Sequence, residues 1–232
     1  MPSPLSGILV VNKHSGISSA GALTRIKLLF LKPIRPKFGH AGTLDPFATG
    51  VLLVLIGKGT KRCLELMGQP KKYRAIMKLG ATTRTLDPTA EEIAHEDVDP
   101  TLKDQQARIE NEIFPSFTGQ ISQVPPAFCA LKQAGRPAYQ SARQGIAMEL
   151  EPRLVTIYSL DLVSFNYPFL EFDVCCGKGT YIRSLACDIA AALGTTGYLT
   201  KLTRTAVGDY TLDGSVELDT LTSELLSSNL RL

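Results

Sequence analysis

The chain has 232 residues, 25 of them Lys or Arg and 22 Asp or Glu, with a formal net charge of +3 at pH 7. This length and ordinary globular composition suit one α/β or α+β domain and exclude a disordered chain. The longest strongly apolar run, residues 51–56, is far too short for a bilayer core, and the first residues fit neither a secretory signal nor a transit peptide, so we expect a cytoplasmic protein without a membrane span.

The first half of the chain predicts short strands and helices around one long loop. Residues 7–12 are typical of a buried strand, and Ser18 or Ser19 can cap a helix that runs to about residue 31. Residues 32–50 are expected to be irregular, and loops of this length are more often functional than idle. The next expected elements are a buried strand over residues 51–56, a short helix over 60–67, a strand over 73–79 and a hairpin turn over 82–88.

The second half predicts more hairpins than crossovers. Asp99 can cap a helix that has Pro100 at its first position and reaches residue 114. Residues 119–145 are expected to be mostly loop with one short helix. The remaining expected elements are strands over residues 155–162, 170–176 and 198–205, a helix over 180–193 that Gly194 ends, and a short last helix marked by Leu218, Leu221 and Leu225.

Charge is distributed unevenly along the chain. Residues 1–44 contain six Lys or Arg and no acid, so Asp45 is the first carboxylate. Residues 87–112 reverse this balance, with nine acids against two basic residues, which indicates a solvated face away from any polyanion. Solubility alone explains the acidic stretch, while the basic start is equally compatible with binding to a polyanion.

Several common chemistries lack the residues they need. Neither Gly-Lys-Gly-Thr segment, 57–60 or 177–180, is a phosphate-binding P-loop, because the first glycine of that motif is missing. No G-x-S-x-G motif or Ser-His-Asp arrangement is found. The five cysteines form no C-x-x-C pair and are interpreted as reduced apolar residues, and the three histidines share no zinc-site spacing with them. We therefore expect no protein-bound metal.

One loop concentrates the candidate chemistry. Residues 39–50 read GHAGTLDPFATG and place a single carboxylate, Asp45, in a glycine-rich segment before a buried strand. Taken alone, Asp45 could simply cap a turn that begins at Pro46. The segment resembles, however, the catalytic loop of the tRNA pseudouridine-55 synthase (TruB) family, whose signature is close to G-H-A-G-T-L-D-P-x-A-T-G. Similar segments occur in family order along most of the chain: GILVVNKHSGISS, KKYRAIMKLGATTRT, VPPAFCALKQAGRPAYQSARQG, GKGTYIRSLACDIA and TKLTRTAVGDY.

This resemblance implies a fold and a reaction. The fold would be the α+β pseudouridine-synthase type, with a mixed, largely antiparallel central sheet flanked by helices and a cleft that holds Asp45. The reaction would convert uridine 55 in the T-loop of tRNA to pseudouridine without a cofactor. Asp45 would attack uracil carbon 6 or ribose carbon 1′, the glycosidic bond would break, and the uracil would rotate and rejoin through carbon 5. The T-arm of tRNA is the expected partner of a monomer that needs no obligate protein partner.

The resemblance also implies roles for residues far from the loop. Arg183 would pair with the catalytic aspartate and keep it ionised; its side chain is expected to leave the core near the helix N-terminus, and a solvent-facing arginine is the alternative. Tyr73 would stack on the flipped uracil, or else be an ordinary inward residue of its strand. Tyr181, Lys132 and Leu202 would line the pocket, and His40 would fill the gap left by the flipped base. His40 could instead be a loop histidine bonded to the backbone, and Lys132 a phosphate contact.

The chain departs from the family pattern at its end. Residues 1–232 are expected to form a single catalytic domain, without the C-terminal PUA-type RNA-binding domain that bacterial members usually carry. Weaker or more salt-sensitive tRNA binding would follow. Three alternatives stay open: a non-catalytic RNA-binding or tRNA chaperone module, the catalytic subunit of a guide-RNA-dependent synthase, and a hydrolase or nuclease that uses Asp45. The last is disfavoured because no second carboxylate lies close in sequence.

Overall fold

The computed structural model describes residues 5–30, 36–95, 100–129, 131–133, 136–144, 146 and 150–231. By internal contacts the chain divides into two compact units. The first comprises Met1–Arg74 and Leu202–Leu232, and the second comprises Ala75–Lys201. None of the described helices has the length and apolar character that crossing a membrane requires.

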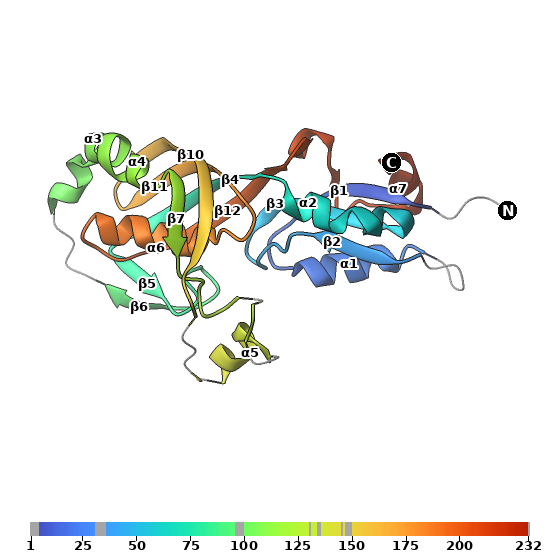
Figure 1. The fold of residues 1–232 in the computed structure, drawn as a ribbon, viewed down its shortest axis with the longest axis horizontal. Coiled ribbons are helices and arrows are strands. Elements are labelled where there is room, and N and C mark those ends of the chain that lie inside the picture. The colour runs from blue at the N-terminus through green and yellow to red at the C-terminus, as the bar shows by residue number, and fades with distance from the viewer. Residues whose placement is uncertain are drawn as a thin grey trace. The chain divides into compact units, whose positions relative to one another are not determined.

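The first unit is built on two long apolar strands. β1 (Gly7–Lys13) pairs antiparallel with β3 (Thr49–Ile56) over its whole length, from Gly7 opposite Ile56 to Lys13 opposite Gly50. Alternate side chains of both strands pack with Leu66 in one buried core, as the apolar runs in the sequence predict. The other elements of this unit, several of which Figure 1 labels, are α1 (Ser19–Lys27), β2 (Phe38–Ala41), the 3-10 helix η1 (Gly57–Arg62), α2 (Cys63–Gly68), β13 (Tyr210–Thr211), η4 (Leu212–Gly214), β14 (Val216–Glu217) and α7 (Ser223–Ser228).

The second unit is built on an antiparallel set of strands that Figure 1 shows side by side. β10 (Arg153–Asn166) pairs antiparallel with β7 (Gly119–Gln123) and with β11 (Phe169–Cys176). β11 buries every second side chain, and α6 (Ile182–Ala192) buries Ile182, Leu185 and Ile189. The other elements are β5 (Ala81–Thr83), β6 (Glu92–His95), η2 (Pro100–Asp104), α3 (Gln106–Arg108), the π-helical turn η3 (Ile109–Ile113), α4 (Phe114–Ser116), β8 (Lys132–Gln133), β9 (Arg136–Pro137) and α5 (Ala138–Arg143).

Two strands, β4 (Lys71–Leu79) and β12 (Gly197–Val207), contain residues of both units. Among the described residues, ten strands belong to one sheet. Eight follow the order β14-β1-β3-β12-β4-β11-β10-β7, with β2 on β3 and β13 on β12. Parallel pairs join β1 to β14 and β3 to β12, whereas the pairs of β1 with β3, β2 with β3, β10 with β7 and β10 with β11 are antiparallel. The predicted α+β class with a mixed, largely antiparallel sheet is confirmed.

Most predicted elements are present with shifted ends, but two loop predictions are wrong. The segment 32–50, expected to be irregular, contains β2, because Phe38–Ala41 pairs with the edge of β3. The segment 119–145 contains the one short helix expected, α5, but also β7, which pairs with β10. Neither strand shows a clear alternation in sequence, so pairing with another strand decided both conformations.

Two helix predictions also need correction. The helix expected over residues 100–114 is a 3-10 helix followed by short α- and π-helical turns, although Leu102, Ile109 and Ile113 are buried as expected; Asp99 lies outside the described residues. The last helix is only Ser223–Ser228. Leu218 and Leu221 are buried ahead of it, and Leu225 within it is exposed.

Gly50, at the start of β3, is expected to be essential for folding. Its φ is +104°, and an added Cβ would collide with the backbone oxygen of Arg204 and lie 2.8 Å from its nitrogen. We expect Gly50→Ala to lower the free energy of unfolding by about 3 kcal/mol or more, measured by urea denaturation. Gly39→Ala is the matched control, because the nearest atom to its added Cβ is Cγ2 of Thr60 at 4.0 Å. Equal losses in the two variants would contradict the steric explanation.

Candidate active site

Asp45 lies, half-buried, in the loop between β2 and β3. The backbone of this loop is held by hydrogen bonds from several parts of the first unit. Each carbonyl from Gly42 to Pro46 accepts at least one: Gly42 O from Nη2 of Arg204 (3.0 Å), Thr43 O from its Nη1 (3.4 Å), Leu44 O from Oγ of Ser19 (2.9 Å), Asp45 O from the amide of Ala48 (3.1 Å) and Pro46 O from the amide of Gly16 (2.8 Å). The position of the Asp45 backbone is therefore specified by residues outside the loop as well as within it.

Arg204, on β12, is a residue that sequence reasoning missed. Its side chain is 1% exposed, and besides the two loop carbonyls its Nε donates to the carbonyl of Val51 at 2.7 Å. These hydrogen bonds to backbone carbonyls supply acceptors for the buried guanidinium and fix its orientation. The signal in the sequence is a charged residue at an inward position of an otherwise alternating strand.

Lys13, the last residue of β1, is the second cation that sequence reasoning missed. Its side chain is fully buried, and its Nζ donates to the carbonyls of His14 (2.9 Å), Ile17 (2.8 Å) and Pro46 (3.3 Å). Burial lowers the pKa of Lys13 from 10.5 to about 8; attraction to Asp45 opposes this shift, and repulsion from Arg204 adds to it. At neutral pH the Lys13 ammonium group is therefore positively charged, and it contacts the carbonyl of Pro46, the residue after Asp45.

The lowered pKa of Lys13 predicts how stability depends on pH. Between about pH 8 and pH 10.5 the unfolded state keeps the Lys13 proton that the folded state has released, so this residue makes the free energy of unfolding rise with pH. The free energies of unfolding of the wild type and of Lys13→Met are to be measured at several pH values across this window. The wild-type value minus the variant value removes the contributions of titrating groups that both proteins share. One such group is Cys187, whose burial raises its pKa to about 12. The difference should grow as pH increases, and a constant difference would contradict the prediction.

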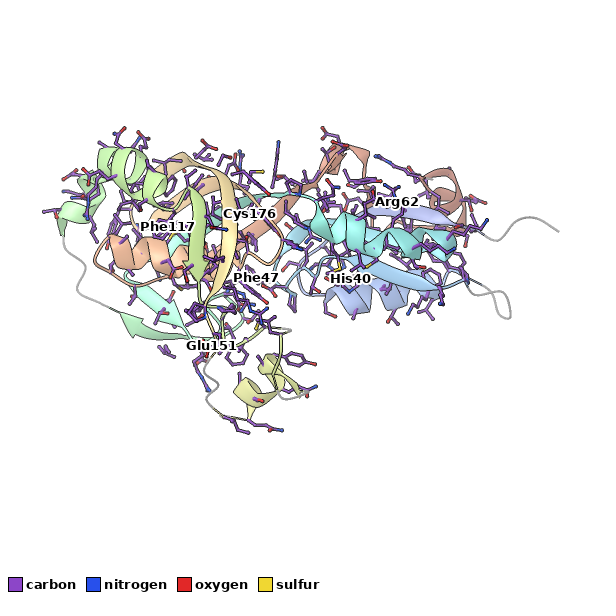
Figure 2. All side chains as sticks on the ribbon, viewed as in Figure 1. His40, Phe47, Arg62, Phe117, Glu151 and Cys176 are labelled. Carbon is purple, nitrogen blue, oxygen red and sulfur yellow. The ribbon has the colours of Figure 1, made fainter. Side chains whose placement is uncertain are left out.

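The first unit also holds three of the residues expected to contact the substrate. His40 is half-buried on β2 opposite Val54, not in a loop, and is labelled in Figure 2. Burial, and then repulsion from Arg204, lower its pKa from the ordinary 6.5, so its imidazole is neutral at physiological pH. Tyr73 on β4 is 9% exposed, and Leu202 on β12 is 6% exposed. The three side chains are thus a neutral imidazole and two nearly buried hydrophobic groups.

Arg183 lies in the first turn of α6, in the second unit, and is 3% exposed. Its Nη1 donates to the carbonyl of Thr85 and its Nη2 to that of Phe128, both at 2.8 Å, and Nη1 lies 3.6 Å from Oδ2 of Asp87. The expectation that this side chain leaves the core, and the solvent-facing alternative, are both wrong. Carbonyls and a carboxylate from two loops replace the water that the guanidinium loses.

Asp87 corrects a second expectation. It belongs to the acidic stretch that was assigned to a solvated face, yet it is 5% exposed. Its Oδ1 accepts hydrogen bonds from the hydroxyl of Thr85 (2.6 Å), the amide of Thr89 (3.0 Å) and the hydroxyl of Thr89. Asp87 is thereby oriented toward Arg183, which makes it a further residue of the candidate site that the sequence pattern concealed.

Tyr181, the N-cap residue of α6, is held through its backbone. The buried side chain of Gln123 accepts from the amide of Tyr181 at 2.8 Å and donates to its carbonyl at 3.1 Å. The hydroxyl of Ser184 donates to the carbonyl of Val124 at 2.7 Å. Burial and the neighbouring Cys129 raise the pKa of Tyr181, so its phenol stays protonated. The last residue of β7, Gln123, and the residue after it, Val124, therefore position the start of α6, a role for Gln123 that sequence reasoning missed.

The seven predicted site residues are distributed over both units. Asp45, His40, Tyr73 and Leu202 belong to the first, and Lys132, Tyr181 and Arg183 to the second. Lys132 lies on β8, where its backbone pairs with Pro137. Among the described residues, no group of three His, Cys, Asp or Glu side chains is arranged to hold a metal ion.

Residues 29–182 match the family model described as TruB family pseudouridylate synthase, N terminal domain. The chain belongs to the TruB family. A tRNA pseudouridine synthase B of Bordetella avium is 44% identical over 219 residues, which cover 94% of this chain and 87% of that protein. The protein of the same description from Dechloromonas aromatica is 43% identical, over 94% of this chain and 71% of that protein. The resemblance to the TruB family is thus confirmed, and this TruB-family chain is a pseudouridine synthase, an isomerase of uridine in RNA.

Solved structures show the same fold. A chain from the crystal structure of a Cbf5-Nop10-Gar1 complex superposes with a TM-score of 0.70 at 25% sequence identity, over 97% of this chain and 59% of that one. A chain from a structure of an H/ACA RNP bound to a substrate RNA superposes with a TM-score of 0.64 at 24% identity. The TruB-family chain therefore spans about three fifths of the length of these structural neighbours.

Proposed function

We propose that the chain converts uridine 55 in the T-loop of tRNA to pseudouridine, with Asp45 as the nucleophile. The observation that carries this proposal is the loop GHAGTLDPFATG, whose five central carbonyls all accept hydrogen bonds and whose single carboxylate is Asp45. Curated relatives with 40 to 45% identity are described as tRNA pseudouridine synthase B, which supports tRNA as the substrate.

The proposed reaction is balanced without a redox partner. Asp45 attacks uracil carbon 6 or ribose carbon 1′, and the bond between uracil nitrogen 1 and ribose carbon 1′ breaks. The uracil rotates, carbon 5 forms the new bond to carbon 1′, carbon 5 loses its proton to solvent, and nitrogen 1 gains one. The Asp45 carboxylate is regenerated when its bond to the nucleotide breaks.

Other residues take supporting roles in this proposal, as the resemblance implies. Arg183 keeps the nucleophile ionised and oriented. Tyr73 stacks on the flipped uracil, and the neutral imidazole of His40 fills the space that the base leaves, which its lowered pKa supports. Tyr181, Leu202 and Lys132 line the pocket. The partner is the T-arm of tRNA, and the chain acts in the cytoplasm as a monomer, with no cofactor and no obligate protein partner.

The proposal is tested by tritium release from a tRNA transcript labelled at uridine carbon 5. We expect about one label per tRNA to be released by the protein alone, since each isomerisation frees one carbon-5 hydrogen. A transcript with cytidine at position 55 should release none. Good tRNA binding without release would instead favour the tRNA chaperone, and release only in the presence of a guide RNA would favour the guide-dependent synthase.

A further inference from the structure

We propose that Ser19 is a positioning residue for the reaction, whose hydroxyl holds the backbone of Leu44 and thereby the adjacent nucleophile. This inference rests on the proposed role of Asp45. Ser19 is the first residue of α1, lies 25 residues before Leu44 in sequence, and is 1% exposed. The family resemblance assigns it no role.

The Ser19 hydroxyl satisfies both backbone groups of one residue. The amide of Leu44 donates to Oγ of Ser19 at 2.7 Å, and the same hydroxyl donates to the carbonyl of Leu44 at 2.9 Å. A hydroxyl can do this because it is both a donor and an acceptor, so it replaces the two hydrogen bonds that a neighbouring strand would supply. Leu44 is itself 3% exposed, so water has little access to these two backbone groups.

The direction of the Asp45 side chain depends on these bonds. On the C-terminal side of Asp45, its own carbonyl accepts a hydrogen bond from the amide of Ala48, and the next carbonyl, that of Pro46, accepts from Gly16 and Lys13. The Ser19 bonds hold the residue on its N-terminal side. With the peptide units on both sides placed, little freedom is left to the Cα–Cβ bond of Asp45, as attack at one defined atom requires.

The helix itself does not need the Ser19 hydroxyl. Ser18 is the N-cap residue of α1, and its side chain accepts a hydrogen bond from the amide of Gly21 at 3.0 Å. Ser18 is exposed, whereas Ser19 is buried. Two adjacent serines on one helix thus serve different purposes, capping for Ser18 and loop positioning for Ser19, which provides a matched control.

The test compares Ser19→Ala with Ser18→Ala in single-turnover tritium release with enzyme in excess over labelled tRNA, beside the tRNA dissociation constant from filter binding. For Ser19→Ala we expect the rate to fall by about 30-fold or more, with the dissociation constant within about twofold of the wild type. Ser18→Ala, which weakens only the helix cap, should keep its rate within about twofold. An unchanged rate in Ser19→Ala, or equal losses in both variants, would overturn the proposal.

A second pair of variants covers the case in which Ser19→Ala does not fold. Ser19→Thr and Ser19→Val introduce side chains of nearly the same shape, and only threonine keeps the hydroxyl. With each rate normalised to the folded fraction, Ser19→Thr should exceed Ser19→Val by about 10-fold or more. Equal rates would refute the proposal. Absence of release by the wild type would refute the proposed function together with this inference, whereas an active wild type with indifferent Ser19 variants would refute the inference alone.

Discussion

Replacing Asp45 by asparagine is expected to abolish pseudouridine formation while the protein stays folded and still binds tRNA. Asparagine has nearly the same size as aspartate but lacks the anionic oxygen that forms the covalent bond. We expect the single-turnover rate to fall by about 10⁴-fold or more, as is typical when a nucleophile is removed. Tritium release and mass spectrometry of the digested tRNA would measure the loss.

The control for this substitution is Asp209→Asn, an exposed aspartate of the same unit. It changes net charge by the same amount and should leave the rate within about twofold, because surface substitutions away from a site have small effects. Filter binding should give similar tRNA dissociation constants for both variants and the wild type. An Asp45→Asn protein that retained more than about a tenth of the rate would rule out Asp45 as the nucleophile.

The second large effect is expected at the buried pair of Arg183 and Asp87. Lysine at position 183 has a single donor nitrogen, so it cannot reproduce the two separate nitrogens, Nη1 and Nη2, that the planar guanidinium presents to the carbonyls of Thr85 and Phe128. We expect Arg183→Lys to lower the single-turnover rate by about 10² to 10³-fold with little change in tRNA binding. Asp87→Asn, which removes the charge that orients Arg183, should lower it by about tenfold to 100-fold.

Stability has to be separated from rate in these variants. Removing one partner of a buried ion pair costs about 3–5 kcal/mol, so urea denaturation should show a clear loss for Asp87→Asn, and rates should be compared per folded molecule. Arg108→Lys is the matched control, since Arg108 lies in the same unit with its side chain 43% exposed and should tolerate the change. A wild-type rate in Arg183→Lys would show that Arg183 has only a structural role.

Much of this fold was predictable because the spacing of apolar residues along the chain reflects which side chains are buried. β11 alternates apolar and polar residues, and the apolar positions of α6 recur at helical spacing, so both elements were found with ends shifted by a few residues. β2 was not predictable, because Phe38–Ala41 has no alternation and takes its conformation from hydrogen bonds to β3. The same reason explains β7, which pairs with β10.

The candidate site likewise has residues that the sequence predicted and residues that it did not. The candidate catalytic loop, with Asp45, was recognised because its twelve residues are contiguous in the sequence. Asp87 was assigned to a solvated face because acids surround it in sequence, whereas its burial depends on Arg183, 96 positions away by residue number. Lys13 was counted among the basic residues of the first 44, and Arg204 was not singled out. Residue type alone does not tell a buried cation from an exposed one, and only the inward position of Arg204 in an alternating strand is a signal.

The sequence by itself determined the family, the candidate catalytic loop and the elements whose side chains repeat with a regular period, because these features depend on residues that are neighbours along the chain. Only the tertiary structure decided what holds the loop in place. Ser19 bonds to a residue 25 positions away, Lys13 to one 33 positions away and Arg204 to one 162 positions away. Hydrogen bonds from side chains to distant carbonyls leave no periodic signal, since a carbonyl accepts them whatever side chain its residue carries.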